Sequence, residues 1–452
     1  NPFWSPDNQT LYFLSTRSGS VQLFEMPMSG GEPKQITNIS TGISEPVLSP
    51  DGKLLAFATE VFPECGTDDD CNKKINDALD KGPLKAHMGD NLLYRHWDSY
   101  KDGRRSHIFI YNFENETYTN LTPGDWDSPT FSPGGGGGFA FSPDSRELCF
   151  MSKRVPNPAE STNSDLWIVS VDGGNLKNIT RENAAWDGHP VYSPDGKYIA
   201  YLKQLIPGYE SDKFRIALYN RSTGESKIIT ESFDNWVNDF VWADDSRTIY
   251  FNGDVMGYSP IYRIDIQSEK IEKISEDGAI FGFKLSPRND FIIYNKRSTH
   301  IPAELYRLDL SNKKSTQLTF ENKSFTEEVD VRPAEHMWVE GADGKKVHVF
   351  IVKPHNFDPG KKYPLILNVH GGPQSQWMDS FRGDWQVYPG AGYIVAFANP
   401  HGSTGYGQDY TAAISGDWGG RVYEDLMKVT DALEELPFVD KDRIGAMGWS
   451  YG

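Results

Sequence analysis

A Ser-Pro-Asp turn runs directly into an alternating strand pattern in Tyr192-Ser193-Pro194-Asp195-Gly196-Lys197-Tyr198-Ile199-Ala200-Tyr201-Leu202. Related turns recur about every 45 to 50 residues, with one step twice as long. The clear copies are Trp4-Ser5-Pro6-Asp7, Leu48-Ser49-Pro50-Asp51 and Phe141-Ser142-Pro143-Asp144, and the degenerate ones are Trp242-Ala243-Asp244-Asp245 and Leu285-Ser286-Pro287-Arg288. The first part of the chain is therefore built from a repeated β unit.

Each of these six turns is followed by one short ending of the Ile-Thr type. The endings are Ile36-Thr37, Leu121-Thr122, Ile179-Thr180, Ile229-Thr230, Ile274-Ser275 and Leu318-Thr319. Because turns and endings pair one to one, the doubled step is one unit with an insertion at about residues 61–105. Four-stranded units of this length are typical of β-propeller blades, since one blade cannot bury both faces of its sheet alone.

The repeat predicts a β-propeller over residues 1–327, with about seven blades of which six are visible. Because the sequence begins inside a blade, we expect seven blades and not six. The aspartates of the turns are expected to bind backbone amides and to carry no chemistry. The run Gly134 to Gly138 suits a flexible or closely packed hairpin and needs no ligand.

Composition limits the classes of partner. The 452 residues carry a net charge of -18 with 38% hydrophobic content, which indicates a multidomain chain that binds neither nucleic acid nor a membrane. No run of 18 apolar residues occurs, and no signal peptide is visible ahead of the first turn. We expect the true N-terminus to be missing.

Three cysteines are present. Cys65 and Cys71 lie six positions apart in a polar segment, where a disulfide can close a small loop. The alternative is a pair of free thiols in a reducing cytosol; a zinc site is disfavoured because no second ligand pair is nearby. Cys149 lies in an apolar run and reads as a buried thiol. A disulfide would indicate an oxidising compartment.

After about Glu328 the pattern changes to longer apolar strands. Strands are expected at residues 347–352, 365–369, 393–398 and 443–447, with a helix at 422–436 that ends at Pro437. Strand, helix and strand in this order predict a right-handed crossover in a mostly parallel sheet.

The last predicted strand leads into Gly448-Trp449-Ser450-Tyr451-Gly452, which spells G-x-S-x-G. This is the pattern of a nucleophile elbow, and the preceding strand supplies the context that a short motif needs. Upstream, His370-Gly371-Gly372-Pro373 follows another strand, where hydrolases place an oxyanion donor. Residues 328–452 are therefore predicted to be the N-terminal part of an α/β-hydrolase domain, truncated at the elbow. We expect His370 to hold the loop and not to act as the base.

Further motifs support a family assignment. They are Asn399-Pro400-His401-Gly402-Ser403-Thr404-Gly405-Tyr406-Gly407, Gly416-Asp417-Trp418-Gly419 and Tyr94-Arg95-His96-Trp97-Asp98. Together with the propeller repeat, H-G-G-P and G-W-S-Y-G, they resemble the prolyl oligopeptidase family (S9) of serine peptidases. Within that family the chain is most similar to the branch of bacterial dipeptidyl peptidase 5 and acylaminoacyl-peptidase-like enzymes.

The resemblance implies a serine peptidase that needs no cofactor and no metal. Ser450 matches the nucleophile, and the amides of Tyr451 and Gly372 match the oxyanion donors. His370 stands where some relatives carry a tyrosine donor, which favours an oxyanion hole made of backbone amides. The acid and histidine of the triad are implied beyond Gly452, so these 452 residues alone are expected to be inactive.

The implied substrates are short peptides that release N-terminal dipeptides with Ala or a hydrophobic residue before the cut. Glu64 and Asp98 are candidates to bind the substrate's free amine, because a buried ammonium needs a paired charge; Arg95 and Trp97 are candidates to line the site. A location in the periplasm or outside the cell is expected, and a homodimer is compatible with the resemblance. Two rivals stay open: an acylaminoacyl peptidase or oligopeptidase, and a non-catalytic propeller binding protein that keeps a hydrolase remnant.

Overall fold

The computed structural model describes residues 2–131 and 137–452. The glycine run at 134–138 therefore lies largely outside the described residues. The chain divides into two compact units, the first of Asn1–Glu210 with Ile216–Ile229, and the second of Ser211–Arg215 with Thr230–Gly452.

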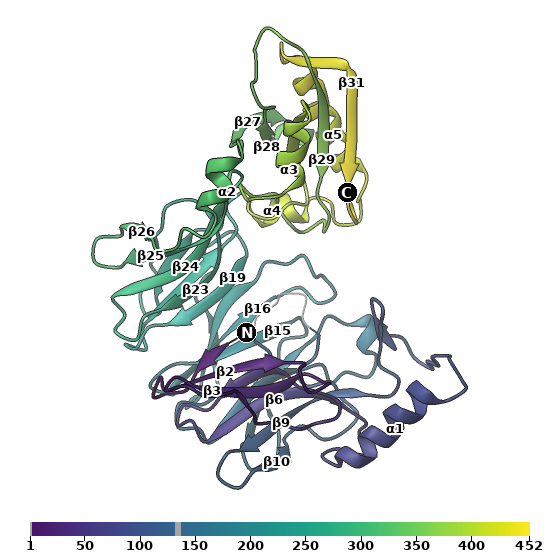
Figure 1. Cartoon of the computed structure of the whole chain (residues 1–452), viewed down its shortest axis with the longest axis vertical. Helices are drawn as coiled ribbons and strands as arrows, with labels where there is room; N and C mark the ends of the chain where they lie inside the picture. Colours follow the sequence, from purple (N-terminus) through teal and green to yellow (C-terminus); the bar gives the residue numbers. More distant parts are fainter. Residues whose placement is uncertain (1, 132–136) are drawn as a thin grey trace. The chain divides into compact units, whose positions relative to one another are not determined.

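The described part of the first unit contains four antiparallel sheets of four strands each (Figure 1). The first three sheets are β1 (Phe3–Trp4), β2 (Thr10–Ser15), β3 (Gln22–Pro27) and β4 (Lys34–Gln35); β5 (Ser44–Leu48), β6 (Leu54–Val61), β9 (Arg105–Asn112) and β10 (Thr117–Asn120); and β11 (Phe139–Phe141), β12 (Glu147–Ser152), β13 (Asp165–Ser170) and β14 (Lys177–Asn178). The fourth is β15 (Asp187–Tyr192), β16 (Tyr198–Lys203), β17 (Arg215–Asn220) and β18 (Ser226–Ile228).

Two more sheets of the same kind lie in the second unit. They are β19 (Val237–Trp242), β20 (Thr248–Gly253), β21 (Ile261–Asp265) and β22 (Ile271–Lys273); and β23 (Ala279–Leu285), β24 (Phe291–Ser298), β25 (Ile301–Asp309) and β26 (Ser315–Gln317). The described residues thus form six β-propeller blades, in agreement with the six turns and endings of the sequence. The seventh blade that we also expected is not among them, since the first sheet already has all four of its strands, β1 to β4.

Side-chain hydrogen bonds explain the repeated turn. In each clear copy the serine hydroxyl donates to the aspartate, as from Ser193 Oγ to Asp195 Oδ1 at 2.7 Å. The same hydroxyl accepts the amide of Tyr198 at 3.0 Å, and Asp195 accepts the amide of Lys197 at 3.0 Å. The aspartates therefore do structural work, because they satisfy backbone donors where the turn enters the next strand.

The endings have an equally specific task. In five of the six endings the hydroxyl oxygen accepts a backbone N–H of the third strand of the same blade, as Thr180 Oγ1 does from Leu166 at 2.9 Å. The equivalent bonds are Leu23 to Thr37, Ile108 to Thr122, Ile261 to Ser275 and Leu305 to Thr319. Each of these five endings thus attaches the end of the outermost strand of its blade to the neighbouring strand.

The insertion leaves and re-enters one blade at a single point. Val61, the last residue of β6, pairs with Arg105, the first residue of β9. Between them lie helix α1 (Asp69–Lys81), for which Asp68 is the N-cap, and a small hairpin of β7 (Arg95–His96) and β8 (Ser99–Tyr100). The long insertion is tolerated because β6 and β9 stay paired up to the point where it begins.

The hydrolase-like part is a five-stranded sheet in the order β27-β28-β30-β29-β31. Its strands are β27 (Ala334–Glu340), β28 (Lys346–Val352), β29 (Tyr363–Val369), β30 (Ile394–Asn399) and β31 (Val439–Gly448). The pairs β29-β30 and β29-β31 are parallel, whereas β27 and β28 run antiparallel to their neighbours. The remaining short elements are η1 (Pro158–Glu160), α2 (Lys323–Glu328), η2 (Ala342–Gly344) and α4 (Gln408–Ala412).

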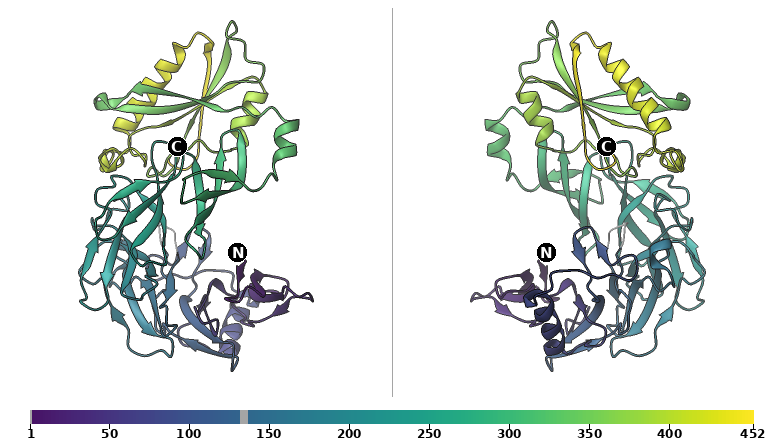
Figure 2. Two further views of the ribbon diagram at one scale, coloured as in Figure 1. Left: turned by 90° about the vertical axis from the view of Figure 1, so that its left-hand side faces the viewer. Right: turned by 90° about the vertical axis from the view of Figure 1, so that its right-hand side faces the viewer.

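Helices cover both faces of this sheet (Figure 2). Val429 and Leu433 of α5 (Gly420–Glu434) pack on the face that carries Val349 and Leu367. On the other face Trp385 of α3 (Asp384–Gly390) stacks on Phe397 with ring centroids 3.6 Å apart. Burial on both faces explains why these strands read as continuous apolar runs.

Candidate active site

The G-x-S-x-G residues form a sharp turn directly after β31. Ser450 has a φ of 59°, a left-handed conformation that is uncommon for residues other than glycine. A Cβ on Gly448 would lie 2.2 Å from the carbonyl oxygen of Gly452, and one on Gly452 would lie 2.3 Å from that of Val369. Both glycines are therefore required by close backbone contacts, as the elbow interpretation predicts.

The H-G-G-P loop lies against this turn. A Cβ added to Gly371 would meet the Trp449 carbonyl oxygen at 2.7 Å and the Ser450 Cβ at 2.9 Å. Only a glycine at position 371 lets the loop approach the serine so closely. The two motifs, about 80 residues apart in sequence, are thus brought together in space.

Two backbone amides beside Ser450 are available for a ligand. Gly372 has a φ of 131°, a conformation suited to glycine, and its N–H donates to no atom among the described residues. The N–H of Tyr451 likewise has no acceptor within the described part of the chain. Unsatisfied N–H groups next to a nucleophile are what an oxyanion hole requires. The Tyr451 side chain is anchored separately, because its hydroxyl donates to the Trp418 carbonyl.

His370 is occupied by structural bonds. Its Nδ1 lies 2.8 Å from the Gly371 carbonyl oxygen and its Nε2 2.9 Å from Ser403 Oγ. The side chain is only 5% exposed, and burial lowers the pKa of His370. With both ring nitrogens engaged, the imidazole ties the H-G-G-P loop to the loop after β30, which is the role expected of it.

A second histidine makes a buried pair with an acid that the sequence analysis did not single out. His401 Nδ1 lies 2.7 Å from Asp425 Oδ2, and the same oxygen accepts the His401 amide at 2.7 Å. Asp425 Oδ1 accepts the Ala342 amide at 2.7 Å. Both oxygens of this fully buried carboxylate are satisfied, so the pair fixes the loop after β30 to α5.

The substrate candidates of the insertion lie in the first unit. Arg95, Trp97 and Asp98 share the β7-β8 hairpin, where Trp97 is 76% exposed and the Arg95 side chain donates to the Trp97 carbonyl. Glu64 is also exposed, in the loop before α1. Ser450 belongs to the second unit, so a role for these four residues at the serine stays a prediction.

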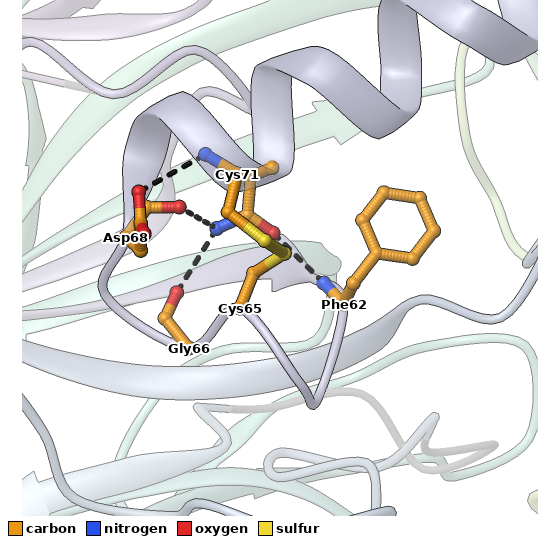
Figure 3. The surroundings of a disulfide bond; sticks show 6 residues. Phe62, Cys65, Gly66, Asp68 and Cys71 are labelled. Atoms are coloured by element: carbon orange, nitrogen blue, oxygen red, sulfur yellow. Dashed lines mark hydrogen bonds between the residues drawn. A yellow bond between two sulfur atoms is a disulfide. The ribbon is translucent and has the colours of Figure 1, made fainter.

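Cys65 and Cys71 are joined in a disulfide that closes the loop at the start of α1 (Figure 3). Asn72 supports the same loop: its Nδ2 donates to the Gly66 carbonyl at 3.0 Å, and its Oδ1 accepts the Phe62 amide at 2.9 Å. Cys149 is a buried free thiol. Within the described ranges there is no cluster of three or more His, Cys, Asp or Glu side chains able to hold a metal ion.

Comparison with known proteins finds one family model, similar sequences and similar folds. Residues 379–452 match the model of the prolyl oligopeptidase family. A dipeptidyl-peptidase 5 of Porphyromonas gingivalis is 34% identical over 460 residues, which cover 100% of this chain and 66% of that protein. A dipeptidyl-peptidase 5 of Schizosaccharomyces pombe is 27% identical over 471 residues, which cover 99% of this chain and 66% of that protein.

Among solved structures, an acylaminoacyl peptidase of Pyrococcus horikoshii superposes with a TM-score of 0.80 at 20% identity, covering 100% of this chain and 66% of that one. The dipeptidyl peptidase 4 of Porphyromonas gingivalis gives a TM-score of 0.65 at 20% identity, with 100% and 64% covered. The chain thus spans 66% or less of the length of these proteins. No helix among the described residues is long and apolar enough to cross a membrane.

Proposed function

Because the chain belongs to the prolyl oligopeptidase family of serine peptidases, we propose that Ser450 is the nucleophile of an exopeptidase that releases N-terminal dipeptides from short peptides. The observation that carries the proposal is the strained turn at Ser450, in contact with Gly371 and flanked by the amides of Gly372 and Tyr451, which donate to no atom of the described residues.

The reaction is an acyl transfer. A histidine, held by an acid, takes the proton of Ser450 Oγ while the oxygen attacks the carbonyl carbon of the scissile bond. The amides of Gly372 and Tyr451 donate to the resulting oxyanion. The C–N bond then breaks, the histidine proton passes to the leaving amine, and water releases the acyl group from Ser450. In the chain order of α/β-hydrolases the acid and the histidine both follow the nucleophile in sequence.

The dipeptide product requires recognition of a free α-amine. A carboxylate is suited to this task because it can pair with the ammonium group of the substrate once that group is buried and no longer hydrated. Glu64 and Asp98 remain our candidates for it, with Arg95 and Trp97 as neighbouring contacts of the substrate. The disulfide supports a periplasmic or extracellular location, since such bonds persist in oxidising compartments.

The test compares two substrates on the full-length protein: a dipeptide reporter with Ala before the cut and a free amine, and its N-acetylated form. The proposal predicts a preference of at least about tenfold in kcat/KM for the free amine, and Ser450→Ala should lower kcat by at least about a thousandfold. Glu64→Gln and Asp98→Asn identify the anchor, because losing it should raise KM for the free amine alone. Preference for the acetylated form would favour an acylaminoacyl peptidase, and activity that survives Ser450→Ala would contradict the nucleophile.

A further inference from the structure

The loop that carries Gly372 rests on the fifth blade, within the second unit. The contact is made by residues 254–258, the turn that follows β20, which we call the blade-five turn. Gln376 reaches it with both ends of its amide: Oε1 accepts the Gly257 N–H at 2.8 Å, and Nε2 donates to the Tyr258 carbonyl at 3.1 Å. Gln376 is only 7% exposed. Two hydrogen bonds from one buried side chain thus fix the H-G-G-P loop to a propeller blade.

The loop after β30 binds the same turn. Thr404 Oγ1 donates to Asp254 Oδ2 at 2.6 Å, and the Met256 N–H donates to the Gly405 carbonyl at 2.9 Å. Asp254 is only 8% exposed, and burial raises its pKa. A hydrogen bond to a nearly buried carboxylate is among the stronger kinds available to a hydroxyl.

The H-G-G-P loop and the loop after β30 are also hydrogen-bonded to each other. The Thr404 N–H donates to the Ser375 carbonyl at 2.9 Å. A Cβ on Gly405 would lie 2.6 Å from Gln376 Oε1 and 3.2 Å from the Met256 nitrogen. The blade-five turn and the two loops are therefore in close contact. This contact explains the glycine at position 405, because a side chain there would clash with both neighbours.

This support is transmitted to Gly372 through a short and tightly folded segment. A Cβ on Gly372 would lie 2.8 Å from the Gln374 nitrogen and 3.2 Å from the Ser375 Cβ. The Ser375 N–H donates to the Pro373 carbonyl at 2.8 Å. Only residues 373–375 separate Gly372 from Gln376, so we infer that a shift of Gln376 is passed along this folded segment to the amide of Gly372.

We propose that the blade-five turn is a positioning element of the oxyanion site, with Gln376 and Thr404 as the positioning residues that hold the Gly372 amide in place. The inference rests on the proposed acyl transfer at Ser450. Neither side chain is required to touch substrate; each acts through the loop that presents the donor.

The test uses Thr404→Val and Gln376→Ala in the full-length protein with the free-amine dipeptide reporter. Removing an oxyanion donor costs about a hundred- to a thousandfold in kcat, and a displaced donor should cost a part of that, about tenfold. KM should stay within about twofold, because the ground-state carbonyl gains little from the donor. Thr404→Ser keeps the hydroxyl and should restore kcat to within about threefold.

Thr319→Val is the matched control. It also removes a threonine hydroxyl that donates to a blade carboxylate, that of Glu304 at 2.5 Å, but in the sixth blade. Its kcat should stay within about twofold of the parent. Hydrogen exchange read by mass spectrometry gives a second measure: peptides covering 375–377 and 402–406 should exchange at least about tenfold faster in Thr404→Val than in Thr319→Val.

The outcomes separate the two proposals. Activity that survives Ser450→Ala refutes the proposed function and this inference with it. Activity that is lost in Ser450→Ala but unchanged in Thr404→Val and Gln376→Ala refutes this inference alone. A lower kcat without faster exchange in these peptides would also overturn it, because the substitutions would then act by another route.

Discussion

Replacing Gly371 by alanine should separate the oxyanion loop from the nucleophile. The added methyl would lie 2.9 Å from the Ser450 Cβ and 2.7 Å from the Trp449 carbonyl oxygen. Carbon atoms in contact prefer about 3.5 to 4.0 Å, so loop and elbow must move apart by roughly 0.6 to 1 Å. A misplacement of about 1 Å can cost a hundredfold in rate. We therefore expect kcat/KM to fall by roughly ten- to a hundredfold, with a stability loss of about 1 to 3 kcal/mol from overpacking.

The assay is dipeptide release by the full-length protein, together with urea unfolding of the same samples. Gly383→Ala is the control, because a Cβ there meets nothing within 4 Å and the residue already has a φ of -61°. The control should keep its activity and gain up to about 1 kcal/mol of stability. If Gly371→Ala keeps kcat/KM within twofold, the loop does not press on the serine and the site geometry described above is wrong.

Three other predictions concern parts of the chain away from the serine. Burial lowers the pKa of His348 to about 4, so the unfolded chain binds the proton at a higher pH than the folded protein does. The free energy of unfolding should therefore fall by about 2 to 3 kcal/mol as the pH drops from about 6.5 to 4. Urea unfolding of His348→Gln should show a weaker pH dependence, and the same dependence as in the parent would contradict this. Cys71→Ser should destabilise the protein by about 2 kcal/mol, and dithiothreitol should lower the parent's melting temperature but not the variant's; equal melting of the two would count against the disulfide's role. Asp195→Ala should cost about 1 to 2 kcal/mol through the lost turn bonds and leave kcat unchanged, whereas a loss of kcat would mean that a turn aspartate has a part in the chemistry.

The propeller and the elbow could be predicted because their signals are local. The turn at Ser193 and Asp195 satisfies donors within five residues, so each blade carries its own pattern in the sequence. The buried strands of the hydrolase sheet appear as apolar runs for the same reason. The start of β31 was predicted too late, at Arg443 instead of Val439, because the polar residues 440–442 interrupt the apolar run although Val439 already pairs with Tyr363.

The support of the oxyanion loop could not be predicted in this way. Gln376 meets Gly257 across 119 positions of sequence, and Thr404 meets Asp254 across 150. Neither partner repeats with any period, and a buried glutamine or threonine resembles an ordinary loop residue in sequence. The glycines at 405 and 407 were the one hint in the sequence that this loop packs closely against another part of the chain. Which part it packs against is known only from the fold.

The nucleophile itself can be identified by its chemistry. A fluorophosphonate reacts with an activated serine when the hydroxyl oxygen attacks phosphorus and fluoride leaves, which marks the residue with a stable mass. Peptide mapping of the labelled full-length protein should find this adduct on Ser450, and Ser450→Ala should abolish it. An adduct on another serine, or labelling that persists in Ser450→Ala, would contradict the assignment of Ser450 as the nucleophile.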